Sequence, residues 1–275
     1  MALAAVFLLG SPAAASEPSS SGVGIAGAQG PLAGVGFQSG IDVSHWQGYI
    51  DWQKVGRTAI DFAIAKATEG TYFVDGYYHR NKQRAEAAGL HFTAYHFANP
   101  SRRNGSVYID ARREADWFLR HAHLKARNLV PALDLERTGG LGRDALRRWT
   151  LAWLDRVEAR LDVKPMIYTS PSFWANYLGN TQAAARQGYE VLWVAHWRTH
   201  RPWVPARRWN GNGWTLWQWT DCGRVSGVRS CVDRDYFGGD SLAELTIRES
   251  RLQMRWRASI TRLGSAHPVV ARDAR

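Results

Sequence analysis

Apolar residues along this chain gather in short runs, which alternate with longer stretches where they recur every three to four positions. The short runs are rich in β-branched and aromatic residues and predict strands, whereas the longer spacing predicts helices. Helices are expected at residues 76–88, 108–124 and 143–161. Strands are expected at residues 40–44, 61–67, 92–97, 129–135, 165–169, 191–196, 215–219 and 232–237.

The order of these elements predicts the fold class. Strands and helices that alternate indicate parallel strands joined by right-handed crossovers, and eight such strands close into a barrel. No clear helical pattern separates the last three strands, which are joined by segments rich in Trp, Gly and Pro. We therefore expect an α/β protein, a single TIM-like barrel of the (β/α)5(β)3 type, over residues 40–250.

The two ends of the chain differ from its middle. Residues 1–15 hold an apolar stretch followed by small residues, which is typical of a secretory signal peptide. Residues 16–39 are rich in Gly, Ser and Ala and predict a flexible lead-in. Residues 251–275 form a basic tail with six Arg and one Asp. Because the apolar stretch is too short to cross a bilayer, we expect a secreted protein without a membrane span.

Composition and cysteine usage narrow the function classes. The 275 residues carry a formal charge of +11, which suits anionic cell-wall polymers, nucleic acid or membrane surfaces. No nucleic-acid recognition motif accompanies this charge, so specific binding of nucleic acid is not expected. Cys222 and Cys231 enclose a short segment with two glycines and predict a disulfide, with free thiols as the alternative. No Cys/His spacing fits a metal and no cofactor motif is present, so neither is expected.

Candidate carboxylates lie at the predicted strand ends. Asp134 and Glu136 end the run VPALDLE, Asp42 lies in GIDVS, and Asp233 or Asp235 lies in VDRDYF. Residues two apart on a strand share a face, and C-terminal strand ends line the mouth of such a barrel. We therefore expect these carboxylates to meet at the mouth, with Glu136 nearest the rim.

Clustered carboxylates suit cleavage of a glycosidic bond, because one can be held protonated beside another that stays ionised. The alternative is that the acids pair with Arg and serve as scaffolding of the barrel wall. Aromatic and hydrogen-bonding residues at the same predicted rim favour a polysaccharide groove. These rim residues are Tyr95, His96, Tyr168, Trp193, His196, Trp217 and Gln218.

Eight motifs occur in order along the chain: GIDVSHWQG, DFAIAKATEG, AYHFA, PALDLE, IYTS, LWVAHW, LWQWT and VDRDYF. Together they resemble family 25 of the glycoside hydrolases, the Chalaropsis-type lysozymes, from about residue 40 to residue 239. The resemblance implies a (β/α)5(β)3 barrel that hydrolyses the β-1,4 bond between N-acetylmuramic acid and N-acetylglucosamine in bacterial peptidoglycan. We expect a monomer that acts on this polysaccharide.

The resemblance also implies roles for single residues. Glu136 matches the general acid, and Asp134 matches its acidic partner, implied to orient the 2-acetamido group of the substrate. Asp42 and Asp233 match two further catalytic carboxylates, and Asp235 stays an alternative to Asp233. Two other functions stay open, a non-catalytic sugar-binding barrel and a glycosidase that acts on chitin. Groove positions are matched by Lys66, Glu69, Tyr95, Tyr168, Trp193 and Gln218, to which we add Trp217 from its place at the predicted rim.

Overall fold

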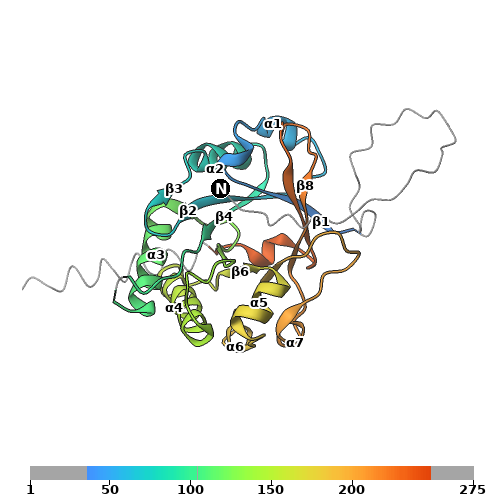
Figure 1. Ribbon diagram of the computed structural model, residues 1–275. Helices are drawn as coiled ribbons and strands as arrows, with labels where there is room; N and C mark the ends of the chain where they lie inside the picture. Colours follow the sequence, from blue (N-terminus) through green and yellow to red (C-terminus); the bar gives the residue numbers. More distant parts are fainter. Residues whose placement is uncertain (1–35, 104, 249–275) are drawn as a thin grey trace, which may run out of the picture.

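A sheet of nine strands closes on itself into a barrel at the centre of the molecule (Figure 1). The computed structural model describes residues 36–103 and 105–248. The short strand Phe73–Val74 (β3) extends the end of one barrel strand, and the other strands form the wall. The wall strands are Gln38–Val43 (β1), Phe62–Glu69 (β2), His91–Phe97 (β4), Ala132–Asp134 (β5), Met166–Thr169 (β6), Leu192–Ala195 (β7), Leu216–Gly223 (β8) and Val232–Phe237 (β9).

One wall strand of the barrel runs in the direction opposite to all the others. Strands β1, β2 and β4 to β8 pair in parallel with their neighbours in this series. Strand β9 runs antiparallel to both β8 and β1 and closes the barrel between them. A short hairpin is enough to reverse a strand, whereas each parallel step needs a longer crossover.

Helices cover only part of the barrel wall. Helices follow each of the first five wall strands, a helix of six residues follows β7, and none separates β8 from β9; in Figure 1, α3 and α4 lie to the left of the strands and β8 to the right. The predicted (β/α)5(β)3 barrel is therefore confirmed. Two 3-10 turns span His45–Gln47 and Leu242–Leu245. The helices are Trp52–Val55 (α1), Tyr78–Ala87 (α2), Val107–Ala122 (α3), Arg143–Leu161 (α4), Pro171–Leu178 (α5), Ala183–Arg186 (α6) and Pro205–Asn210 (α7).

Two apolar clusters stabilise the barrel, one inside its wall and one between the wall and the helices. Strands alternate their side chains between these two faces, which is why both clusters draw on the same strands. The inner cluster includes Phe62, and the Cβ of any residue larger than glycine at position 40 would overlap its ring. Gly40 therefore lets β1 and the Phe62 ring share the interior.

Most element boundaries differ from the sequence prediction by a few residues, and two of the differences, in β5 and β1, change which residues belong to the barrel. Strand β5 starts at Ala132 because the amide of Val130 donates to the carbonyl of Leu245 (2.8 Å), outside the barrel wall. Strand β1 starts at Gln38, so the last two residues of the predicted lead-in belong to the barrel. The predicted signal peptide, most of the lead-in and the basic tail lie outside the described residues. Within residues 36–103 and 105–248, no helix is long and apolar enough to cross a membrane.

The predicted disulfide is confirmed. Cys222 and Cys231 are bonded, with their Cα atoms 4.4 Å apart. The bond joins the end of β8 to the residue before β9, so it ties the base of the loop in the hairpin that closes the barrel.

Candidate active site

The sheet brings four aspartates together inside the barrel, one each from β1 and β5 and two from β9. Asp42 on β1 lies directly opposite Asp233 on β9, and Asp235 lies opposite Gln218 on β8. Because β9 is antiparallel, Asp233 and Asp235 arrive at the start and middle of their strand, whereas Asp42 and Asp134 stand at strand ends. The carboxylates meet as expected, but β9 contributes Asp233 and Asp235 from its N-terminal half, whereas the other acids stand at the C-terminal ends of their strands.

Asp42 is the central member of this cluster. It is buried, with 5% of its surface exposed, and its Oδ2 accepts a hydrogen bond from Gln218 Nε2 at 2.7 Å. Asp233 and Asp235 are both in hydrogen-bonding contact with it. Asp235 is fully buried and accepts a second hydrogen bond from Trp193 Nε1 at 2.8 Å. Both candidates on β9 therefore belong to one connected group of acids.

Asp134 and Glu136 face the same region from the end of β5. Asp134 is 5% exposed, and its Oδ1 is buried with no hydrogen-bond partner among the described residues. Leu135 points to the outer apolar cluster, so Glu136 returns to the inner face, where it is exposed to solvent. A buried aspartate and an accessible glutamate thus lie side by side at the mouth.

All five carboxyl groups have raised pKa values, and loss of hydration is the largest cause for each. Burial raises the pKa of Asp42 to about 7 and that of Asp233 to about 10. It raises the pKa of Asp134 well above the ordinary range, and the charge of Glu136 adds to this. The pKa of Glu136 also rises, because surrounding protein displaces water from a carboxyl group that still reaches solvent through the mouth. Charges this close do not all ionise, so the cluster retains protons near neutral pH.

Gln218 fixes the orientation of Asp42. Its Oε1 accepts hydrogen bonds from Tyr168 Oη (3.0 Å) and Trp197 Nε1 (2.9 Å). Because two donors bind the amide oxygen of Gln218, its amide nitrogen must face Asp42. Asp42 Oδ2 therefore accepts a hydrogen bond from this nitrogen. The ring of Trp193 packs edge-on against Tyr168 (4.5 Å between centroids) and Tyr95 (6.3 Å), which forms an aromatic floor below the acids.

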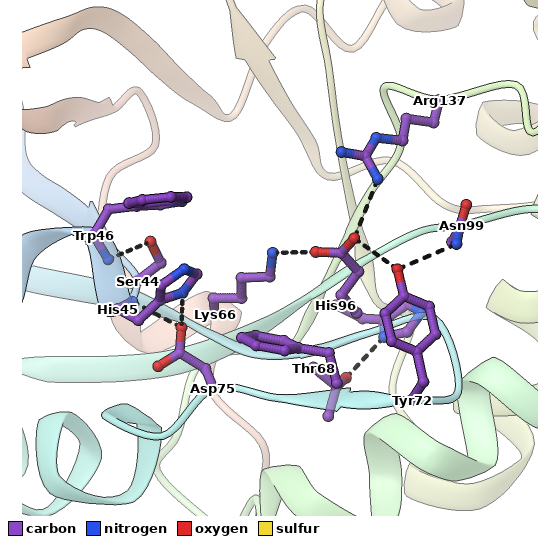
Figure 2. Close-up of polar contacts among 12 residues, drawn as sticks. Ser44, His45, Trp46, Lys66, Thr68, Tyr72, Asp75, His96, Asn99 and Arg137 are labelled. Atoms are coloured by element: carbon purple, nitrogen blue, oxygen red, sulfur yellow. Dashed lines mark hydrogen bonds and ion pairs between the residues drawn. The ribbon is translucent and has the colours of Figure 1, made fainter. Parts of the chain in front are cut away.

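A second polar network borders the acids on the side of β2 (Figure 2). Glu69 accepts from Lys66 Nζ (2.6 Å), Arg137 Nη1 (3.1 Å) and Tyr72 Oη (3.0 Å). Although burial raises the pKa of Glu69, the hydrogen bonds from Lys66 and Tyr72 and the charges of Lys66 and Arg137 together lower it. Lys66 and Arg137 also act on Glu136, since their charges oppose the rise in its pKa.

The scaffolding alternative finds no support in these contacts. None of the five carboxyl groups whose pKa is raised forms an ion pair with Arg or Lys in the part of the chain that the structure describes. Nor do described His, Cys, Asp and Glu residues form a group suited to a metal ion. A cluster of acids without counter-ions raises the free energy of the folded state, and this points to a chemical task.

Comparison with known proteins identifies the family. The family model described as "Glycosyl hydrolases family 25" matches residues 41–228. The chain belongs to glycosyl hydrolase family 25. This family 25 enzyme is therefore a glycoside hydrolase, as its acid cluster indicates.

Proteins similar to this chain are named lysozyme or N,O-diacetylmuramidase. Lysozyme M1 of Streptomyces globisporus is 36% identical over 226 residues, which cover 79% of this chain and 73% of the relative. The N,O-diacetylmuramidase of Chalaropsis sp is 28% identical over 209 residues, 70% of this chain and 93% of the relative. The bacterial lysozyme from Streptomyces coelicolor has a solved structure that is 36% identical, with a TM-score of 0.67 over 75% of this chain and 94% of that one.

Not every residue proposed from the sequence lies in the site of this family 25 enzyme. Trp217 is fully buried in the outer cluster and donates from Nε1 to the carbonyl of His196 (2.8 Å). It neighbours Gln218, which faces inward, so alternation along β8 turns it away from the mouth. His96 also faces outward, between Thr68 and Glu114. The side chain of His196 accepts from the amide of Trp203 (2.9 Å) and so holds the loop after β7.

Three exposed aromatic residues at the mouth were missed. Trp46 is 64% exposed, Tyr72 is 63% exposed and Trp197 is 41% exposed. Each follows a barrel strand by two to three residues, and Figure 2 shows Trp46 and Tyr72 on opposite sides of Lys66. The signal available in the sequence was an aromatic residue just beyond a strand end, whereas the aromatic residues that we predicted all lie within the expected strands.

Proposed function

We propose that this chain is a secreted lysozyme, which cleaves the β-1,4 bond between N-acetylmuramic acid and N-acetylglucosamine in peptidoglycan. The observation that carries the proposal is the pair at the mouth, a buried Asp134 beside an accessible Glu136, both with raised pKa values and without an ion pair to any described Lys or Arg. Relatives named lysozyme and N,O-diacetylmuramidase support the choice of polymer. The sequence of residues 1–15 supports export.

Glu136 acts as the general acid. Its carboxyl group reaches solvent at the mouth, where a bound polysaccharide would lie, and its raised pKa lets it hold a proton. It gives that proton to the glycosidic oxygen while the bond from that oxygen to the anomeric carbon breaks. The resulting carboxylate then removes a proton from the water that completes hydrolysis.

Asp134 acts on the 2-acetamido group of the muramic acid residue. Its buried Oδ1 lacks a donor among the described residues, and an acetamido N–H would supply one. A hydrogen bond of this kind favours the ionised form of Asp134, so the proton of the coupled pair stays on Glu136. The acetamido oxygen then attacks the anomeric carbon as the leaving group departs, and water opens the cyclic intermediate.

The deciding experiment compares the wild type with Glu136→Gln on purified peptidoglycan. Loss of the acid should lower the rate at which reducing ends are released by about 10²–10⁴-fold, while the fold is kept. Glu244→Gln, at an exposed position far from the cluster in the turn Leu242–Leu245, is the matched control and should keep full activity. Near-full activity of Glu136→Gln would remove Glu136 from this role.

Two further measurements separate the finer parts of the proposal. Chitin oligomers lack the lactyl group of muramic acid, so digestion of chitin at the rate of peptidoglycan would favour the chitinase alternative. A path through the acetamido group retains the anomeric configuration, because the anomeric carbon is attacked twice from alternate faces. NMR of the first products should show retention, and inversion would exclude the role given to Asp134.

A further inference from the structure

The segment after β7 has an unusual composition, and of its aromatic residues we have placed only Trp197 at the catalytic site. Residues 196–214 contain four Trp, four Arg and neither Asp nor Glu. This segment accompanies the part of the wall that lacks long helices, and the ring of its last residue, Trp214, lies 6.0 Å from the ring of Trp217 on the outer face of β8. It therefore presents aromatic and cationic side chains where a helix would otherwise cover the barrel.

A pocket of about 510 Å³ opens in this surface. That volume lies in the range of sites for small ligands, roughly 300–1,000 Å³. Trp203 is 49% exposed, and Phe37 and Trp214 are partly exposed with their rings 5.7 Å apart. The lining consists of Phe37, Arg201, Pro202, Trp203, Val204, Arg208 and Trp214, and we call it the Trp203 pocket.

The charges in the Trp203 pocket are all of one sign. Arg201 and Arg208 are exposed, and neither forms an ion pair with a carboxylate in the described part of the chain. No acidic residue lines the pocket. Free guanidinium groups bind carboxylates or phosphates through paired hydrogen bonds, and an open indole face packs against the apolar face of a sugar ring. Together these groups suit a ligand with both a sugar ring and an acidic group.

The pocket is separate from the catalytic cluster. One of its lining residues, Trp214, packs against Trp217 on the outer face of β8, whereas the adjacent Gln218 contacts Asp42 on the inner face. Only one strand of the barrel therefore lies between the two sites. A ligand in the Trp203 pocket touches none of the residues assigned to bond cleavage.

We propose that the Trp203 pocket binds a second strand of peptidoglycan, with a sugar ring on Trp203 and stem-peptide carboxylates on Arg201 and Arg208. The identity of this polymer rests on the proposed function. An insoluble wall presents many parallel strands, so a contact outside the mouth holds the enzyme at the surface while one strand is cut. The positive charge of the segment matches the acidic stem peptides.

The test uses the full chain with Glu136→Gln in the background, so that binding is measured without cleavage. Retention on peptidoglycan sacculi is compared between this protein and one that also carries Trp203→Ala and Arg208→Ala. We expect the added changes to weaken binding at least about fivefold, because exposed Trp and Arg anchors dominate such contacts. Binding of the changed protein should also depend less on salt, because the charge of Arg208, which salt would screen, has been removed. The backbone N–H of position 203 still reaches His196 in the variant, so the loop keeps its anchor.

A matched control carries Tyr177→Ala and Arg160→Ala, which remove one exposed aromatic and one exposed Arg from the helical side. This control should bind as the parent does, and equal losses in both proteins would refute the pocket. Sacculi stripped of stem peptides should bind the parent more weakly, and unchanged binding would refute the role of the arginines. In the active enzyme, Trp203→Ala with Arg208→Ala should leave hydrolysis of short soluble oligosaccharides unchanged. If the wild type releases no reducing ends from sacculi, the proposed function fails instead.

Discussion

The acid cluster should make the folded state less stable as the pH rises, and Asp42 offers the cleanest test. Burial lifts the pKa of Asp42 from 3.8 to about 7, so the folded protein keeps a proton that the unfolded chain releases between these values. The stabilisation from this proton is fully present below about pH 3.8 and is lost as the pH rises through about 7. Substitution Asp42→Asn removes the titrating group and keeps its shape.

The size of the effect follows from the shift. Each pKa unit corresponds to about 1.4 kcal/mol, so a rise of roughly three units corresponds to about 4 kcal/mol between acid and alkaline conditions. The amide introduced at position 42 can accept from Gln218 and donate towards Asp233, so the hydrogen bonds of the cluster persist. We expect Asp42→Asn to match the wild type near pH 4 and to exceed its stability by up to about 4 kcal/mol at pH 8.

Urea unfolding at several pH values measures this difference directly. The slope of the free energy of unfolding against pH should be less negative in Asp42→Asn by about 1.4 kcal/mol per unit between pH 4 and 7. Asp240→Asn, at an exposed position outside the cluster, should follow the wild type throughout. If Asp42→Asn and the wild type have the same stability at pH 8, the cluster does not carry the electrostatic cost inferred here.

Two substitutions test the surroundings of the acids. Trp197→Phe keeps a ring at the mouth but removes the N–H that holds Gln218, so kcat on peptidoglycan should fall about 2–10-fold with KM little changed. An unchanged kcat would show that Tyr168 alone orients the amide. A Cβ at position 139 would overlap the carbonyl oxygen of Pro100, so Gly139→Ala should lower stability by about 3 kcal/mol or more in thermal unfolding. Gly140→Ala meets only backbone strain at φ +78°, and should cost about 1 kcal/mol; equal losses would refute the contact with Pro100.

Much of the barrel could be predicted because strand and helix periods are local properties of the chain. The helix at Arg143–Leu161 and the strand at Val232–Phe237 have the bounds that the pattern predicts. Strand β5 is shorter than predicted because Val130 pairs with Leu245, a residue more than a hundred positions away. Local periodicity carries no information about such a distant partner.

The site was predictable where residue type and strand position agreed. Asp134 and Glu136 could be paired from their spacing, since side chains two apart share a face. The same rule, applied to Trp217 and Gln218, allows only one of these neighbours to face inward, and the structure gives that place to Gln218. Asp233 lies opposite Asp42 as expected, although β9 runs antiparallel to β1 and not parallel to it as we assumed. A short turn closed by a disulfide after β8 indicates a hairpin, and therefore an antiparallel β9.

The packed interior of the barrel decides how a long polymer meets this protein. The barrel interior beneath the acids is filled by apolar side chains and is therefore closed; they include Ile64, Met166, Leu216 and Phe237. A polysaccharide therefore cannot thread through the molecule, and it must lie across the open end. Both halves of a cut strand then leave sideways, so cleavage needs no free chain terminus.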